Sequence, residues 1–293
     1  MKFIPLIFSF CIGAFLLSSC NNAGTVDNDT PGPVVIKKKE RKKPSVVKYH
    51  VEKAKAWVKK NDSTGDQRQL DIVTFVNRTD KANLLKMDSI LVPDDMSGDR
   101  EFYLPFPVSA PFLKDVKKII FFSYPSQSFA AYEYGELAYT GPTNMGRKKD
   151  PTPEGLYYTN WKAEQTTSTF NDEWELKWNF NIENKEGIGF HQYELPGYPA
   201  SHSCLRLQEK DARFLYDWAD QWVLKGTDDL RAKGTPVVVF GTYAFDAPKP
   251  WWQLLTNPAA LDIPVSTLEQ YAGPKLAEII AEQNKRATVE SSK

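Results

Sequence analysis

Cysteine and histidine are scarce in this chain of 293 residues, which contains three of each. Excess charge of one sign is also absent, because Lys+Arg and Asp+Glu both number 37. This balance gives no support to nucleic-acid binding, for which a basic surplus is typical. No internal repeat is visible. Aromatic residues are plentiful instead, at 13% with eight Trp and thirteen Tyr, which favours a β-rich fold or surfaces that face carbohydrate.

The first twenty residues have the pattern of an export signal. Lys2 precedes a nearly continuous apolar run from Phe3 to Leu17, which is too short to span a membrane comfortably. The run ends in Leu17-Ser18-Ser19-Cys20, which resembles a bacterial lipobox. The resemblance implies that Cys20 is lipidated and holds the protein at the periplasmic face of the inner or outer membrane of the cell envelope. Ordinary cleavage after Ser19 is the alternative.

The cysteine count then leaves one thiol. Cys11 would be lost with the signal peptide and Cys20 would carry lipid, so Cys204 has no partner for an intramolecular disulfide. An unpaired thiol kept in an exported protein requires an explanation.

Residues 21–48 are predicted to form a disordered tether. They are rich in Asn, Asp, Thr, Pro and Gly and end in a basic run, Lys37–Lys43, with almost nothing to bury. The run is interpreted as a solvated spacer, with contact to anionic head groups or an acidic polymer as the alternative. His50 lies at the boundary of this tether and is assigned no role.

Residues 49–110 are predicted to form a small helical subdomain. Leu70, Val73 and Val76 recur with helical spacing, and Ser89–Val92 forms a short strand before Pro93. This succession is similar to the second half of a LysM peptidoglycan-binding module, although no opening strand is evident. A helical packing subdomain is the other interpretation.

Residues 111–246 are predicted to form a larger domain, and from Val116 its pattern changes to the period of two that is typical of strands. Three strands are expected at Lys118–Tyr124, Phe129–Tyr134 and Leu137–Gly141. Strict alternation of Trp174, Leu176, Trp178, Phe180 and Ile182 with polar residues predicts a half-buried antiparallel strand. These tryptophans are assigned to the core rather than to a sugar-stacking platform.

Helical patterns appear in the second half of this region and beyond it. Gln208–Val223 has one apolar stripe, Thr235–Tyr243 reads as a buried strand, and residues 247–293 form a C-terminal extension with a helix at Lys275–Lys285 and a frayed tail. The whole is therefore predicted to be mainly β, of the α+β class.

The segment Gly187–Leu207 places two of the three histidines close to Cys204. His191 lies thirteen positions before Cys204, and His202 lies two before it. A nucleophilic cysteine needs a base, because the thiolate attacks and the thiol does not. The three residues could also ligate zinc. Zinc is disfavoured because no clear fourth ligand and no second metal motif accompany them.

The stretch from Lys114 to Tyr243 resembles an L,D-transpeptidase catalytic domain. That family carries an upstream His followed by Ser/Thr-His-Gly-Cys, an aliphatic residue and Arg or Asn. Here the pattern is His191 followed by Ser201-His202-Ser203-Cys204-Leu205-Arg206. The turn Thr152-Pro153-Glu154-Gly155 is similar to the family's TP-x-G. The resemblance implies a β-sandwich domain with a few packing helices.

The resemblance also implies roles for these residues in the cross-linking of peptidoglycan stem peptides. Cys204 would attack a stem tetrapeptide and release D-Ala, and a second stem's amine would take the acyl group to give a 3-3 cross-link. His191 would be the base, with its other ring nitrogen held by the Gln192 carbonyl. His202 and the amides of Ser203 and Cys204 would stabilise the oxyanion, supported by Ser201. Arg206 would orient the loop or bind a substrate carboxylate, and no cofactor is required.

Two departures from the family pattern bear on this reading. Ser203 replaces a glycine, and a side chain restricts φ at that position. The interval from His191 to Ser201 is short, although Pro196, Gly197 and Pro199 suit a tight loop. Two alternatives remain: an L,D-carboxypeptidase that uses water as the acceptor, and a non-catalytic peptidoglycan-binding lipoprotein.

Overall fold

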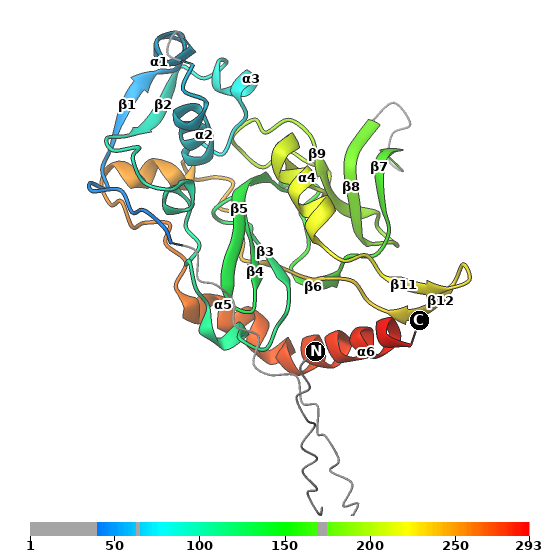
Figure 1. The fold of residues 1–293 in the computed structure, drawn as a ribbon. Helices are drawn as coiled ribbons and strands as arrows, with labels where there is room; N and C mark the ends of the chain where they lie inside the picture. The colour runs from blue at the N-terminus through cyan, green and yellow to red at the C-terminus, as the bar shows by residue number, and fades with distance from the viewer. Residues whose placement is uncertain (1–39, 63–64, 169–174, 293) are drawn as a thin grey trace, which may run out of the picture. The chain divides into compact units, whose positions relative to one another are not determined.

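A mixed β-sheet forms the centre of the fold. The computed structural model describes residues 40–62, 65–168 and 175–292. The predicted signal peptide, Cys20 and Trp174 therefore lie outside the described residues. Within these ranges the large sheet has nine strands in the order β6-β13-β3-β4-β5-β10-β9-β8-β7 (Figure 1). The pairs β13–β3 and β10–β9 are parallel, and the other pairs are antiparallel.

The strands of this sheet have the following bounds: β3 Ile119–Ser123, β4 Ser128–Glu133, β5 Glu136–Asn144, β6 Gly155–Tyr158, β7 Lys162–Thr167, β8 Glu175–Glu183, β9 Ile188–Gln192, β10 Leu205–Leu207 and β13 Pro236–Phe240. A separate hairpin pairs β11 (Val223–Lys225) with β12 (Asp229–Ala232). The mainly β class expected from the sequence is confirmed.

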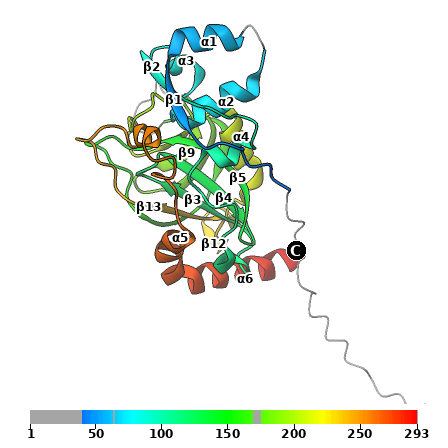
Figure 2. The same ribbon diagram turned by 90° about the vertical axis from the view of Figure 1, so that its left-hand side faces the viewer.

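Strand β3 explains the two-sided core, because it is apolar on both faces. Ile120 and Phe122 pack into a cluster with residues of β8, β9, β10 and the helix α4 (Glu209–Trp218). Ile119 and Phe121 pack on the opposite face against α5 (Val265–Ala272) and α6 (Leu276–Ser291). Figure 2 shows these two helices alongside the sheet. The curled sheet thus buries one layer against itself and the other against helices.

Strand β8 departs from the strict alternation that its sequence predicts. Trp178 has φ +53°, and the β8–β9 register shifts between Lys177 and Phe180. This β-bulge re-aims the side chains on either side of it. Trp178 packs against the core cluster and Tyr216, with ring centroids 5.5 Å apart. Its assignment to the core therefore agrees with the structure, and the predicted strand is present as β8, but the bulge interrupts its strict alternation.

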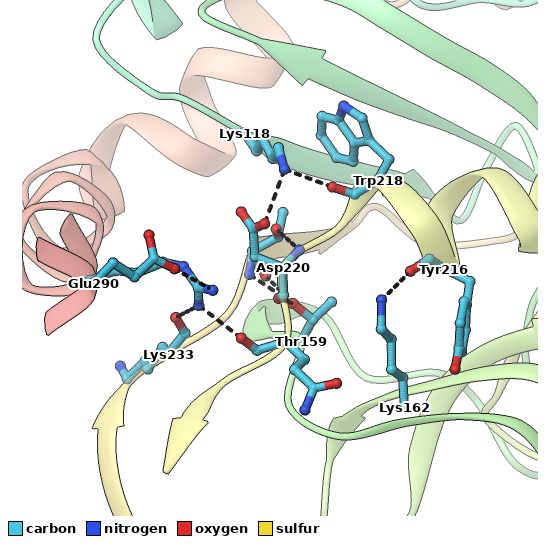
Figure 3. A network of polar contacts seen from close by, with 11 residues as sticks. Lys118, Thr159, Lys162, Tyr216, Trp218, Asp220, Lys233 and Glu290 are labelled. Carbon is cyan, nitrogen blue, oxygen red and sulfur yellow. Dashed lines mark hydrogen bonds and ion pairs between the residues drawn. The ribbon is translucent and has the colours of Figure 1, made fainter. Parts of the chain in front are cut away.

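The helix expected at Gln208–Val223 ends earlier, at Trp218, because tertiary hydrogen bonds capture the chain beyond it. The Asp220 amide donates to Thr235 Oγ1 at 2.9 Å, and the Asp220 carbonyl accepts from Thr159 Oγ1 at 2.6 Å. Lys118 Nζ lies 3.1 Å from the Asp220 carboxylate and 2.8 Å from the Trp218 carbonyl. Figure 3 shows this network.

Helix α6 contacts the backbone near Asp220 through Arg286. The helix extends to Ser291 and is therefore longer than the expected Lys275–Lys285. Arg286 donates to the backbone carbonyls of Gln221 and Lys233 and pairs with Glu290 at 2.8 Å. Shorter 3₁₀ turns occur at Arg100–Tyr103 (η1), Pro111–Leu113 (η2), Pro250–Leu255 (η3) and Gly273–Lys275 (η4).

The N-terminal subdomain contains an opening strand that its sequence pattern does not reveal. β1 (Tyr49–Lys53) pairs antiparallel with β2 (Ser89–Pro93). Between them lie the helices α1 (Ala54–Asp62), α2 (Gln67–Val76) and α3 (Lys81–Leu84). One face of this subdomain forms its own core, and the other packs on Trp251 and Leu254 of the C-terminal extension. Its LysM-like character stays a prediction.

Residues 40–48 fall within the expected tether, yet they contact the folded unit. Arg41 pairs with Glu101 at 3.0 Å, and both side chains are less than a tenth exposed. The Lys42 and Ser45 amides donate to the carboxylates of Asp99 and Asp95. Basic side chains and free amides of this segment therefore find acidic partners instead of remaining solvated.

His50 likewise belongs to a strand, β1, rather than to a tether boundary. Its ring nitrogens lie 2.5 Å from Asp94 Oδ1 and 3.1 Å from Glu52 Oε1.

In the three described ranges, none of the helices combines the length and apolar character needed to cross a bilayer.

Candidate active site

Parallel pairing of β9 with β10 brings the histidine and cysteine segments together. Arg206 lies opposite His191 in the register, and Cys204 immediately precedes β10. Paired residues of neighbouring strands project to the same face of a sheet. One narrow pocket is consequently lined by six residues from this region, namely His191, Tyr193, Ser201, His202, Cys204 and Arg206. Ser168 and Leu176 complete its lining.

Two of the residues proposed from the sequence lie outside this lining. Gln192 reaches the site through its backbone carbonyl oxygen, which lies 3.0 Å from His191 Nδ1. Ser203 turns its hydroxyl away from the pocket, toward the carbonyls of Pro151 at 3.2 Å and Asp150 at 3.4 Å.

The contact with Gln192 selects the tautomer of His191. A carbonyl oxygen can only accept, so Nδ1 carries the proton and Nε2 keeps its lone pair in the neutral ring. The His191 residue is 4% exposed. Burial lowers its pKa to about 4, with a smaller contribution in the same direction from Arg206, and the Gln192 hydrogen bond opposes the shift. Near neutral pH His191 is therefore an uncharged base.

Cys204 is also uncharged in the resting site. Burial raises the pKa of its thiol, which outweighs the lowering by the Gly189 backbone and by the Arg206 guanidinium. Its Sγ lies 3.8 Å from the Gly187 carbonyl oxygen. The resting pair is thus a thiol and a neutral imidazole that line the same pocket. Proton transfer must accompany attack on a substrate.

The backbone before Cys204 takes the conformation for which glycine is suited. Ser203 has φ +76°, in the left-handed region that L-residues with a side chain rarely adopt. Ser203 thus keeps a backbone conformation that suits the glycine of the family pattern. The side chain of serine makes this conformation strained, but it does not move φ out of the left-handed region.

Hydroxyl groups fix the carbonyls of this loop on both sides of the thiol. Thr152 Oγ1 donates to the Ser203 carbonyl at 2.8 Å, and Ser201 Oγ donates to the Cys204 carbonyl at 2.6 Å. The Ser203 carbonyl and the Cys204 N–H belong to one planar trans peptide, so they point in opposite directions. Holding the carbonyl on Thr152 therefore directs the Cys204 N–H away from Thr152.

Thr152 was quoted from the sequence as part of a turn, but its role in this loop was missed. Its Oγ1 also accepts from the Gly146 amide at 2.9 Å. A Cβ at Gly146 would lie 2.2 Å from the Asp150 carbonyl oxygen, so the close approach requires glycine. The sequence signal for this role is the turn Thr152-Pro153-Glu154-Gly155 after Gly146. The spacing of these residues does not indicate which groups the Thr152 hydroxyl contacts.

The side chains of His202 and Arg206, which both line the pocket, have different neighbours. The His202 side chain is about a third exposed, with Nε2 4.0 Å from Asp150 Oδ2. Burial lowers its pKa, as does Arg147, while Asp150 opposes them. Arg206 lies over the Tyr193 ring, 4.4 Å from its centroid, a cation–π contact that holds the guanidinium in place.

The described residues contain no group of three or more His, Cys, Asp or Glu side chains arranged to hold a metal ion.

A family model described as the L,D-transpeptidase catalytic domain, YkuD, matches residues 117–239. No curated protein matches the chain. Among solved structures, an L,D-transpeptidase from Stackebrandtia nassauensis is 22% identical with a TM-score of 0.36, and the match covers 44% of this chain and 57% of that one.

Two mycobacterial structures give similar values. An L,D-transpeptidase from Mycobacterium smegmatis is 18% identical with a TM-score of 0.34, covering 43% of this chain and 59% of that one. One from Mycobacterium tuberculosis H37Rv is 20% identical with a TM-score of 0.34, covering 43% and 58%. The match thus spans less than two thirds of each solved chain. The segment that carries the candidate site, residues 117–239, therefore matches the model of the L,D-transpeptidase catalytic domain family.

Proposed function

We propose that this protein is an L,D-transpeptidase that acts on peptidoglycan stem peptides through a thioester on Cys204. One observation carries the proposal. Cys204 and the buried His191 line the same pocket, and the Gln192 carbonyl holds His191 Nδ1 so that Nε2 is the basic nitrogen. A thiol with an oriented neutral imidazole is the pair that nucleophilic acyl transfer needs.

The first half-reaction makes the thioester. The Cys204 sulfur attacks the carbonyl between the third residue of a stem tetrapeptide and its terminal D-Ala, while His191 Nε2 takes the thiol proton. The tetrahedral intermediate collapses by breaking the carbon–nitrogen bond. D-Ala leaves with the proton returned by the imidazolium, so His191 is neutral again.

The second half-reaction transfers the acyl group. A neutral side-chain amine of another stem peptide attacks the thioester carbonyl, and His191 Nε2 accepts the proton that the nitrogen loses. The carbon–sulfur bond breaks, and the sulfur recovers that proton as a thiol. The product is a 3-3 cross-link, and no cofactor enters either step.

The geometry around Cys204 supports oxyanion stabilisation by this loop. The Thr152 clamp orients the Cys204 N–H, and His202 lies at the same pocket with its side chain partly exposed. Donors fixed before the reaction stabilise developing charge without reorganisation. Arg206 is held over Tyr193, where it suits the carboxylate of the departing D-Ala.

Intact-protein mass spectrometry with a stem tetrapeptide tests this function. The wild-type protein should gain the mass of the donor acyl group, and Cys204→Ala should gain none. His191→Gln should slow acylation by about 10²- to 10⁴-fold, the usual contribution of a general base. His50→Gln, which alters a histidine on β1 remote from the sheet site, is the matched control and should acylate normally. Equal adducts on wild type and Cys204→Ala would refute the proposal.

An L,D-carboxypeptidase is the second candidate, because Cys204 and His191, which line one pocket, would form the same thioester for a water acceptor. With water as the acceptor the same thioester yields a trimmed tripeptide instead of a dimer. Mass analysis of sacculi incubated with the protein separates the two, because cross-linked dimers and tripeptides differ in mass.

We also propose that the protein is anchored in the cell envelope through lipid on Cys20. The support is the sequence alone, since residues 1–39 lie outside the described ranges. Cys20→Ala should move the protein from the membrane fraction to the soluble fraction. Unchanged fractionation of that variant would remove the support for a lipid anchor.

A further inference from the structure

A polar groove of about 810 Å³ adjoins the candidate active site. One wall consists of α2 and the start of α3 in the N-terminal subdomain. The other wall consists of the end of β9 and the start of α4 in the catalytic domain. Tyr193 lines both the groove and the pocket that contains Cys204. The two spaces therefore share a wall next to His191, the base of the proposed reaction.

Hydrogen bonds between the two walls fix the groove in place. Asp80 Oδ2 accepts from the Leu195 amide at 2.6 Å, and Thr79 Oγ1 donates to the Leu195 carbonyl at 2.8 Å. Gln208 Nε2 donates to the Thr79 carbonyl at 2.9 Å. These buried and partly buried contacts hold the subdomain on the catalytic domain, two of them on the loop that follows His191. The groove is thus a built feature and not a gap between loosely joined parts.

Charge is distributed unevenly between this groove and the far side of the pocket. Glu194 and Glu209 are exposed on the catalytic-domain wall, and within the described part of the chain neither carboxylate forms a salt bridge. The nearby Lys210 is already paired with Asp71 at 2.6 Å. On the far side, the groups that act on His202 include the cations Arg147 and Lys149.

We propose that the groove binds the acyl-acceptor stem peptide and that Glu194 and Glu209 attract its side-chain ammonium group. This inference rests on the proposed function. The acceptor must give up a proton to His191, and the groove opens beside that residue's own strand. The basic side of the pocket suits the donor's terminal carboxylate, and Lys81 and Arg213 in the groove suit the acceptor's own carboxylates.

The attacking nitrogen loses two protons, one before and one during its attack. The ammonium is concentrated in the groove by the two carboxylates and loses one proton to water to become a neutral amine. The amine loses a second proton to His191 Nε2 as its carbon–nitrogen bond to the acyl group forms. The carbon–sulfur bond breaks, and the sulfur receives that second proton.

A binding cycle in Cys204→Ala protein tests the groove without any chemistry. The probes are a synthetic stem tetrapeptide with lysine as its third residue and the same peptide acetylated on the lysine Nζ. Calorimetry would compare both peptides with Cys204→Ala and with Cys204→Ala carrying Glu194→Gln and Glu209→Gln. Acetylation should weaken binding to Cys204→Ala about 10-fold, or about 1.4 kcal/mol. The two Glu→Gln changes should weaken binding of the free-amine peptide by a similar factor.

The decisive result is non-additivity, because both changes remove the same interaction. Acetylation should cause no further loss once Glu194 and Glu209 are replaced. Glu269→Gln, an exposed carboxylate on α5 away from the groove, should leave both affinities unchanged. Additive losses, or no loss from the double replacement, would overturn the inference. Failure of wild-type Cys204 to form a thioester would overturn the proposed function instead and leave this binding result interpretable.

In the active protein the same replacement should raise the acceptor concentration that gives half-maximal dimer formation, again about 10-fold. Dimer formation with the wild-type dependence on acceptor concentration would count against the groove as the acceptor site.

Discussion

The hydroxyl of Thr152 donates a hydrogen bond of 2.8 Å to the backbone carbonyl of Ser203, the residue directly before Cys204. The same oxygen accepts from the Gly146 amide at 2.9 Å. One side chain therefore joins the segment that follows β5 to the loop that presents the thiol. Since the Ser203 carbonyl and the Cys204 N–H share a peptide plane, the contact sets the direction of a proposed oxyanion donor.

Thr152→Val removes that hydroxyl and keeps the shape of the side chain. We expect the rate of Cys204 acylation to fall about 10- to 100-fold, because a small displacement of a donor weakens transition-state stabilisation steeply. The free energy of unfolding should fall by only about 1–2 kcal/mol. The measurements are acylation by time-resolved mass spectrometry and urea denaturation. Thr152→Ser, which retains the hydroxyl, should stay close to wild type. Wild-type acylation by Thr152→Val would show that the clamp is merely structural.

Ser203→Gly restores the residue that the family pattern carries. Ser203 adopts φ +76°, which costs an L-residue about 1–2 kcal/mol relative to glycine. Greater freedom of the unfolded chain offsets part of the gain. We expect the free energy of unfolding to rise by about 1 kcal/mol, measured by urea denaturation, with acylation retained. Ser203→Val should destabilise the protein, since a branched Cβ suits this region even less. A destabilised Ser203→Gly variant would mean that the contacts of the serine hydroxyl with Pro151 and Asp150 outweigh the strain.

The sequence predicted the strands that bury a continuous apolar run more reliably than those shaped by neighbours. β3 is apolar on both faces, so its pattern alone identifies it. β1 alternates only weakly, and its partner β2 lies some forty residues away. The bulge at Trp178 and the early end of α4 arise from register and from hydrogen bonds to Thr159 and Thr235. No local pattern contains those partners.

The candidate site divides in the same way. The spacing of His191 and Cys204 predicted a pair that the fold does bring to one pocket, because the residue types are rare and chemically specific. The resting protonation state was not foreseen, since it depends on burial that only the folded chain defines. Thr152 reaches the site from a segment some fifty residues before Cys204, so its partner was not evident.

The pH dependence of acylation should have an acid limb far below the ordinary histidine range. Burial lowers the pKa of His191 to about 4, and only the neutral ring can act as base. The second-order rate of acylation should therefore rise as the pH passes through about 4 and then stay level into the neutral range. The rate is measured from about pH 3 to 8, a range that includes both the lowered pKa of His191 and the pKa of about 6.5 of an unperturbed histidine.

Arg206→Gln tests the electrostatic part of this shift. Arg206 lowers the His191 pKa, so removing the guanidinium should move the acid limb to higher pH, whatever happens to the maximal rate. His202→Gln serves as the control, and its limb should stay at the wild-type position if His191 is the titrating base. A limb near pH 6.5 in the wild type, the value for an unperturbed histidine, would contradict the buried neutral base.

Asp211→Asn should remove a pH-dependent loss of stability that originates in α4. The Asp211 residue is fully buried, Tyr139 donates to its Oδ1 at 2.7 Å, and within the described chain Oδ2 has no hydrogen-bond partner. Burial raises its pKa from 3.8 to about 6, which Tyr139 only partly opposes. The folded state thus holds the proton more tightly than the unfolded state, and stability falls as the pH rises between these two values.

The expected size of that fall is about 3 kcal/mol, complete above pH 6, since each pKa unit corresponds to about 1.4 kcal/mol. Below the unfolded pKa both states are protonated and the penalty vanishes. The side-chain amide of Asp211→Asn does not titrate, so the advantage of the variant over wild type should grow from near zero at about pH 4 to its full value at pH 7. Urea denaturation across this range measures it. Asp217→Asn, an exposed carboxylate on the same helix, should show no such trend. A constant difference between Asp211→Asn and wild type would mean that the buried carboxyl does not titrate in this window.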